Sequence, residues 1–175
     1  MIISVEELRR YIVTNETDEF LSAKMKSIEI MIRKYTNNNF QVRSFRKTAN
    51  IAGGLFIVEG LTPFNSGDTV QITESDRNEG LYVVGETTDT TFTVLENIVD
   101  EADVLVTKVI YPMDVIMGAV NMLKWDLENR NKVGIQSETI SRHSVTYFNM
   151  DGDNSVIGYP KSLTGFLLPY KCARF

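Results

Sequence analysis

The chain has 175 residues, a formal net charge of −5 and a pI near 5.0, with 43% hydrophobic and 23% charged residues. This composition is typical of one globular domain, or of one domain that carries a small insert. The acidic balance argues against a general nucleic-acid coat and against a membrane-surface protein, because both need positive charge to meet phosphate. No apolar run approaches the roughly 18 residues of a membrane span, and the first residues do not resemble a secretion signal. We therefore expect a cytoplasmic protein that does not enter a membrane.

The first 42 residues carry two helical patterns. Ser4 and Glu7 are spaced as in a capping box, which predicts a short first helix. A long amphipathic second helix follows, because apolar residues then recur at helical spacing. These residues are Leu21, Met25, Ile28, Ile32 and Tyr35. Asparagines at 37–39 end this helix, since asparagine tolerates left-handed backbone.

Between residues 43 and 110 the pattern changes to alternation and to strand-favouring residues. Five short strands are predicted, at 55–58, 69–73, 81–84, 91–95 and 104–110, with turn-forming residues between them. Residues 47–111 hold three basic and eleven acidic side chains, a net charge of −8. The remaining residues hold fifteen basic and twelve acidic side chains, a net charge of +3. We expect an acidic β-barrel or β-sandwich.

The helical pattern returns after the strands. Pro112 and Asp114 favour the start of a helix. An apolar stripe then continues this helix to about residue 131. The stripe is rich in methionine, which is more typical of core packing than of a groove for a partner. Residues 140–147 alternate, which predicts one extended stretch. Residues 159–168 predict a short helix that begins at Pro160 and is stopped by Pro169.

The predicted fold class is therefore α+β. It is a small helical bundle, with three long-to-medium helices and a short C-terminal helix, that carries an inserted small antiparallel β-barrel or sandwich. The helical core would comprise residues 1–42 and 112–175. The inserted acidic β-module would comprise residues 43–111.

No group of residues predicts catalysis. His143 lies beside Ser141 and Ser144, but these serines are not in a nucleophile elbow, and neighbours along a strand point to opposite faces. Residues 149–153 resemble the opening of a calcium loop, but the positions for its central glycine and closing glutamate hold Asn154 and Pro160. We predict a protein that is not an enzyme and that uses no cofactor and no metal.

Basic residues concentrate along the second helix and its exit. They are Lys24, Lys26, Arg33, Lys34, Arg43 and Arg46. They could neutralise phosphates, which would indicate a small DNA-binding or DNA-packaging accessory protein. They could also form a solvated helix face, which the spacing of Glu29 and Arg33 favours.

Apolar and cationic residues also gather at the end of the sequence, where a chain frays unless something holds it. Two interpretations stay open. The segment folds back on its own domain, or it inserts into a partner.

The same segment carries a family resemblance. Residues 158–175, GYPKSLTGFLLPYKCARF, resemble the C-terminus of head–tail connector proteins, also called adaptor or head-completion proteins, of long-tailed phages and prophages of Gram-positive bacteria. Residues 134–140, GIQSETI, and 144–147, SVTY, are similar to the segment that follows the last long helix of those proteins. The two predicted N-terminal helices and the helix after the strands match in order and size, so the resemblance spans roughly two thirds of the chain, through pattern more than through an invariant motif.

The resemblance implies a structural virion protein without catalytic residues. Roughly a dozen copies would form a ring under the portal, join the DNA-filled head to the tail, and extend the channel through which duplex DNA passes without sequence-specific binding. Its partners would be the portal protein, a tail-side completion or tail terminator protein, and other copies of itself. It would act in the host cytoplasm during assembly and then in the virion neck.

The resemblance also implies contact residues. The candidates for contact with the portal are Leu167, Leu168, Tyr170, Lys171, Arg174 and Phe175. The candidates for subunit or tail-side contact are Gln136, Ser137 and Glu138. The β-module departs from many members of the family. We expect it to project outward, and an acidic lining that keeps DNA from adhering to the channel is the alternative.

Overall fold

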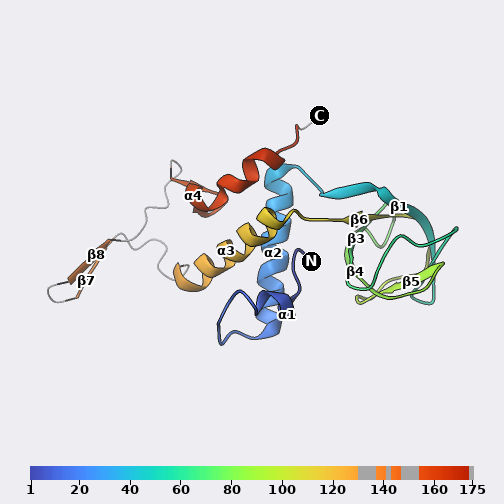
Figure 1. Cartoon of the computed structure of the whole chain (residues 1–175), viewed down its shortest axis with the longest axis horizontal. Coiled ribbons are helices and arrows are strands. Elements are labelled where there is room, and N and C mark those ends of the chain that lie inside the picture. The colour runs from blue at the N-terminus through green and yellow to red at the C-terminus, as the bar shows by residue number, and fades with distance from the viewer. Residues whose placement is uncertain (130–136, 141–142, 147–153, 174–175) are drawn as a thin grey trace. The chain divides into compact units, whose positions relative to one another are not determined.

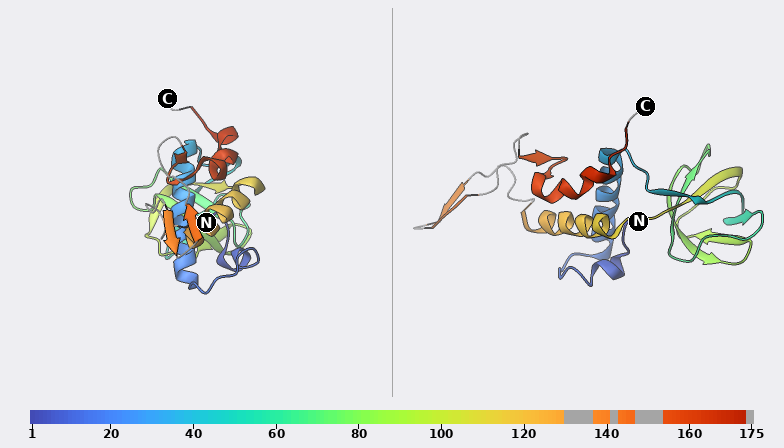
Figure 2. Two further views of the ribbon diagram at one scale, coloured as in Figure 1. Left: turned by 90° about the vertical axis from the view of Figure 1, so that its left-hand side faces the viewer. Right: turned by 45° about the horizontal axis from the view of Figure 1, so that its top comes forward.

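The computed structural model describes residues 1–129, 137–140, 143–146 and 154–173. The chain divides into two compact units (Figures 1 and 2). The β unit comprises Met1 and Asn39–Tyr111, and the helical unit comprises Ile2–Asn38 and Pro112–Phe175. No helix among the described residues is long and apolar enough to cross a membrane.

The predicted fold class, a helical bundle with three long-to-medium helices, is wrong. Helix α1, Val5–Leu8, is a single turn, and the largest ordered assembly is a closed barrel of six antiparallel strands. The first helix ends early because the backbone amides of Arg10 and Tyr11 bond to carbonyls only three residues back, at 3.0 and 2.9 Å, which tightens the last turn. The Ser4 hydroxyl still accepts from the amide of Glu7 at 3.2 Å, as the capping box predicts.

Helix α2, Asp18–Thr36, ends at the asparagines that the sequence predicts. Thr17 caps its start, since the Thr17 hydroxyl accepts from the amide of Phe20 at 3.3 Å. Asn37 ends it in the left-handed region, at φ 50°. Both signals act within a few residues, and the asparagines at 37–39 were sufficient to predict the end of this helix from the sequence.

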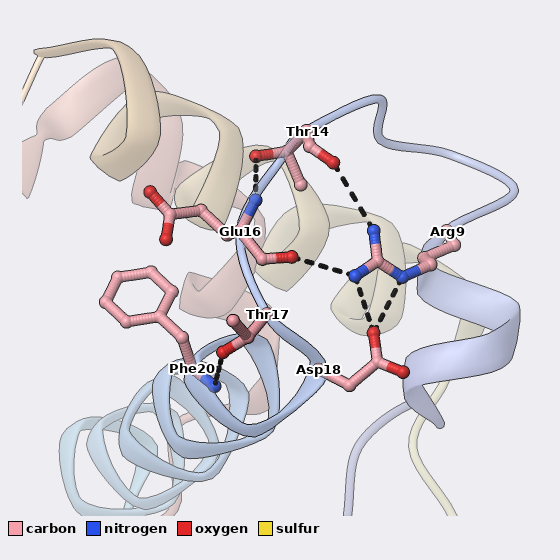
Figure 3. A network of polar contacts seen from close by, with 6 residues as sticks. All are labelled: Arg9, Thr14, Glu16, Thr17, Asp18 and Phe20. Carbon is pink, nitrogen blue, oxygen red and sulfur yellow. Dashed lines mark hydrogen bonds and ion pairs between the residues drawn. The ribbon is translucent and has the colours of Figure 1, made fainter.

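Arg9 fixes the loop that joins α1 to α2 (Figure 3). Its guanidinium donates through Nε and Nη2 to Oδ1 of Asp18, at 2.8 and 2.5 Å. Nη2 also donates to the carbonyl of Glu16 at 2.8 Å, and Nη1 to that of Thr14 at 3.4 Å. One planar cation therefore holds two loop carbonyls and the first carboxylate of α2, a task for which the fork of arginine is suited.

The strands β1 to β6 form the closed barrel in the order β1-β2-β5-β4-β3-β6, every neighbouring pair antiparallel. Of the two forms expected for the β-module, the structure has the barrel. The strands are β1 Gln41–Ala52, β2 Leu55–Val58, β3 Thr69–Thr73, β4 Gly80–Thr87, β5 Thr91–Val94 and β6 Glu101–Val109. The predicted strands at 55–58 and 69–73 are confirmed with the same bounds, and the other three are confirmed with shifted ends. Strand β1 was not predicted separately, because most of its residues are polar and few are buried.

Aromatic rings fill the barrel. Phe56 and Phe92 stack at a centroid distance of 4.5 Å, and Phe64 meets Phe92 edge-on at 5.1 Å. Phe64 comes from the loop between β2 and β3, two strands that are not neighbours, so this loop crosses one end of the barrel and closes it. The loop between β5 and β6 crosses the other end for the same reason, and its Ile98 packs against the core.

The chain enters and leaves the barrel at the same end. Gln41 at the start of β1 pairs with Val109 at the end of β6, and the amide of Ile110 donates to the carbonyl of Phe40 at 3.0 Å. The β1–β2, β3–β4 and β5–β6 connections therefore lie together at the far end, because successive strands run in opposite directions. The β5–β6 loop closes this far end.

The rest of the chain belongs to the helical unit, where helix α3 is Met113–Asn129. The single extended stretch predicted at 140–147 is wrong, because β7 Ser137–Ile140 and β8 His143–Thr146 pair with each other. Two short strands, β9 Ser155–Val156 and β10 Tyr159–Pro160, precede α4 Lys161–Thr164 and the 3₁₀ helix η2 Gly165–Tyr170. The prediction that Pro169 stops the C-terminal helix is wrong, because Pro169 lies inside η2. The chain changes from α to 3₁₀ geometry before it reaches this proline.

Glu101 ties two loops together at the far end of the barrel. Its carboxylate accepts from the Ser75 hydroxyl, the Asp76 amide and the Asn78 side-chain amide, each at 2.6 Å. These hydrogen bonds, that from Ser75 first, hold the pKa of Glu101 below its usual range.

We expect E101Q to destabilise the barrel at neutral pH, because an amide cannot accept from all three donors. The stabilisation by a carboxylate with a lowered pKa is present above the usual glutamate pKa and is lost as pH falls through the lowered value. The difference in unfolding free energy between E101Q and the wild type should therefore shrink as the pH falls below the usual glutamate pKa. Urea unfolding followed by far-UV circular dichroism measures it. E86Q, on exposed Glu86 of β4, is the control, and a pH-independent difference would contradict the assignment.

Candidate docking surface at the C-terminal segment

A buried carboxylate joins the C-terminal segment to α2 and α3. Asp126 of α3 is 8% exposed, and its Oδ2 accepts from the hydroxyl of Tyr159 at 3.0 Å. The ammonium of Lys24, on α2, lies 3.5 Å from the same oxygen. The ring of Tyr159 also meets that of Trp125 edge-on at 5.5 Å. A buried charge requires such partners, so Asp126 fixes where β10 returns to the helices.

Helix η2 then lies close against α3. A Cβ atom built on Gly118 would be 2.2 Å from the ring of Phe166, so this ring occupies the space that a side chain would need. Leu167, the next residue, is completely buried. Gly118 is therefore required by close packing and not by backbone conformation, since its φ is not positive.

The last described residues bind the C-terminal end of α2. The amide of Cys172 donates to the carbonyl of Thr36 at 2.8 Å. The side-chain amides of Asn37 and Asn38 donate to the carbonyls of Ala173 and Tyr170, at 2.9 and 3.1 Å. The carbonyl at the helix end thereby gains the partner that it lacks within the helix. Of the two interpretations of this segment, residues 170–173 adopt the one in which the chain folds back on its own unit.

Two side chains of the C-terminal segment contact residues of α3 and α2. The hydroxyl of Tyr170 donates to both carboxylate oxygens of Asp114, at 2.8 and 2.9 Å, and this hydrogen bond raises the pKa of Tyr170. The ammonium of Lys171 lies 4.0 Å from the centroid of the Tyr35 ring, a cation–π contact. Both residues are thus used inside the unit.

The predicted portal contacts therefore differ in what they can offer a partner. Leu167 is in the core, and Tyr170 and Lys171 contact Asp114 and Tyr35. Leu168 is 60% exposed and points away from the packed face that Leu167 fills. Arg174 and Phe175 lie outside the described residues. Among the described candidates, Leu168 is the apolar side chain that is available for docking.

A groove of about 670 Å³ runs between α3 and the α4–η2 segment. Its apolar lining comes from Met117, Trp125, Leu163 and Phe166, and Asn121 and Glu128 are among the polar residues that line it. The sequence does not predict this groove, because the methionine-rich stripe of α3 is more typical of core packing. Met122 is indeed buried, whereas Met117 lines the groove.

The six basic residues do not act as one group. Lys24 is engaged with Asp126, and Arg46 donates to the side chains of Thr107 at 2.8 Å and Gln41 at 3.2 Å. Four of the six lie on α2, in the helical unit, and two lie on β1, in the β unit. Those on α2 are Lys24, Lys26, Arg33 and Lys34, and those on β1 are Arg43 and Arg46.

The other candidates lie mostly beyond the described part. Ser137 and Glu138 begin β7, and Gln136 is outside the described residues. His143 begins β8, whereas Ser141 and the predicted calcium-like turn at 149–153 are outside the described residues.

No protein-family model matches the chain, and no curated protein matches it either.

We expect G118A to displace Phe166 and loosen η2. Alanine improves helix propensity by up to about 1 kcal/mol, but overpacking at this distance costs about 1–3 kcal/mol. A net loss of unfolding free energy is therefore expected, together with a change in the fluorescence of Trp125, which lines the same groove. The matched control is G165A, where a Cβ would meet nothing within 4 Å. Equal stability of the two variants would contradict the close packing.

Proposed function

We propose that the protein is a head–tail connector, a structural virion protein that joins the portal of a DNA-filled phage head to the tail. Copies of it form a ring that extends the DNA channel, by binding and without catalysis. One observation carries the proposal. Residues 158–175 resemble the C-terminus of connector proteins, and within them Leu168 is exposed on a segment that is otherwise fixed to its own unit.

The ordered backbone of this segment supports a docking role. Its hydrogen bonds to Thr36, Asn37 and Asn38 leave little conformational entropy to lose when a partner covers Leu168. The groove beside it, lined by Met117, Trp125 and Leu163, offers further apolar surface. The helical bundle that the resemblance implied is wrong, so the proposal depends on this segment and not on the fold class.

The β7–β8 pair supports the second contact. Its residues fall in the segment that resembles the connector family, and a two-stranded sheet by itself is marginally stable in water. We assign Ser137 and Glu138, with Gln136, to contact with a neighbouring subunit or with the tail-side protein.

We expect deletion of the gene from its parent phage or prophage to give packaged or leaking heads beside separate, complete tails in electron micrographs. The intact gene should restore joined particles, and L168D should not, because a carboxylate would be desolvated where an apolar contact is needed. L61D is the matched control, since Leu61 of the barrel is 71% exposed. It should restore particles as the intact gene does.

Joined, infectious particles after deletion would overturn the connector role. Joined particles with L168D would leave the connector role standing and would remove Leu168 from the portal contact. A point variant is preferable to truncation after Pro169, because truncation would also remove the Tyr170–Asp114 and Cys172–Thr36 hydrogen bonds that hold the unit together.

A further inference from the structure

Exposed apolar side chains lie among carboxylates at the far end of the barrel. In the β5–β6 loop, Ile98 packs inward, while Leu95 is 72% and Val99 47% exposed. Exposed acidic residues occupy the loops and strand ends around them. These are Glu74, Asp76, Glu79, Asp100 and Asp103. We call these residues, with Leu95 and Val99, the lid surface.

The lid surface is held in a fixed shape. The side-chain amide of Asn78 donates to the carbonyl of Val99 at 2.9 Å, and the Val99 amide donates back to Asn78 at 3.0 Å. The amide of Gly53 donates to Asp100 at 2.7 Å, so the β1–β2 turn is tied to the same loop. Together with the Glu101 hydrogen bonds, these contacts preorganise the surface, which lowers the entropic cost of binding.

Helix α2 presents the opposite chemistry. Lys26, Ile30 and Lys34 are spaced by four residues and therefore share one face of the helix. Ile30 is 49% exposed, and both lysines are exposed. We call these three residues the α2 stripe. It places an apolar side chain between two cations, whereas the lid surface places apolar side chains between anions.

We propose that the lid surface of one copy docks on the α2 stripe of a second copy. The net charge of residues 47–111 is −8 and that of the remaining residues is +3, so contact between barrels is repulsive and contact between unlike units is attractive. Because two different surfaces meet, the contact is heterologous, and repeated copies can close a ring. The partner is thus another copy of this chain, bound by salt-sensitive charge pairs around an apolar contact.

The opposite charges of the two surfaces, with the ring proposed above, favour a second copy as the occupant. This inference rests on the proposed ring. The side chains of the two surfaces bury less interface area than the roughly 1,000 Å² that a stable pair of proteins needs. Closure of a ring adds the avidity that a single contact lacks.

The test is disulfide cross-linking between two full-length chains, both carrying C172S. One chain carries I30C and the other L95C, and they are mixed under a mild thiol oxidant. We expect heterodimer to form at least about tenfold faster than with L61C in place of L95C, because contact raises the local thiol concentration. Leu61 is matched in exposure, at 71%, but lies in the β2–β3 loop at the opposite end of the barrel.

Charge reversal provides the decisive comparison. Adding K26E and K34E to the I30C chain should remove the rate advantage, and adding D76K and E79K to the L95C chain should restore it. Equal rates for L95C and L61C, or no restoration by the second pair of changes, would overturn the proposal. Faster closure within a single chain that carries both I30C and L95C would also overturn it, because the contact would then be internal.

The two proposals fail separately. Cross-linking uses purified protein without portal or tail, whereas the gene deletion reports on head–tail joining. Loss of the cross-link with separate heads and tails in the deletion would remove this contact and leave the connector role. A strong cross-link with joined particles in the deletion would leave the contact and remove the connector role.

Discussion

The buried carboxylate of Asp126 is the constraint on which the helical unit depends. At 8% exposure it needs charge and hydrogen-bond partners, and it obtains them from Lys24 of α2 and Tyr159 of β10. These partners come from three separate parts of the sequence, so the carboxylate selects one arrangement of α2, α3 and the C-terminal segment. Once Tyr159 is in place, the chain that follows lies along α3, where Gly118 leaves room for Phe166. An apolar residue at position 126 would pack without imposing this choice.

The C-terminal segment therefore stabilises its own unit, and this limits which of its side chains can bind a partner. Leu167 is buried, and the backbone of residues 170–173 completes the end of α2. A partner that pulled this segment away would have to break those hydrogen bonds and expose the core beneath Leu167. Docking on the segment where it lies exposes no core and uses the side chain that already points outward. This is why Leu168, and not the whole segment, is the side chain on which the proposed portal contact depends.

The features that the sequence could predict are those decided by neighbouring residues. Ser4, Thr17 and Asn37 lie at helix ends because their side chains or backbone preferences act within a few residues, and the five alternating segments formed strands for the same kind of reason. The errors arose where distant contacts decide. Strand β1 is polar yet pairs on both sides, α1 stops after one turn, and Pro169 fits a 3₁₀ turn. The roles of Asp126 and Gly118 depend on residues far along the chain, and no local pattern reveals them.

The topology of the barrel explains how an acidic module can interrupt a helical unit. Its first and last strands pair with each other, so the chain departs and returns at one end of a closed structure. A closed barrel has no free strand edges, and it therefore brings its own core without offering an edge for aggregation. Its interactions with other molecules must use side chains on the wall or at the far end. The far end is where the β5–β6 loop crosses, where Asn78 and Glu101 hold the loops together, and where Leu95 is most exposed. A rigid surface at the end opposite the connections is the part of such a module best placed to reach a second molecule.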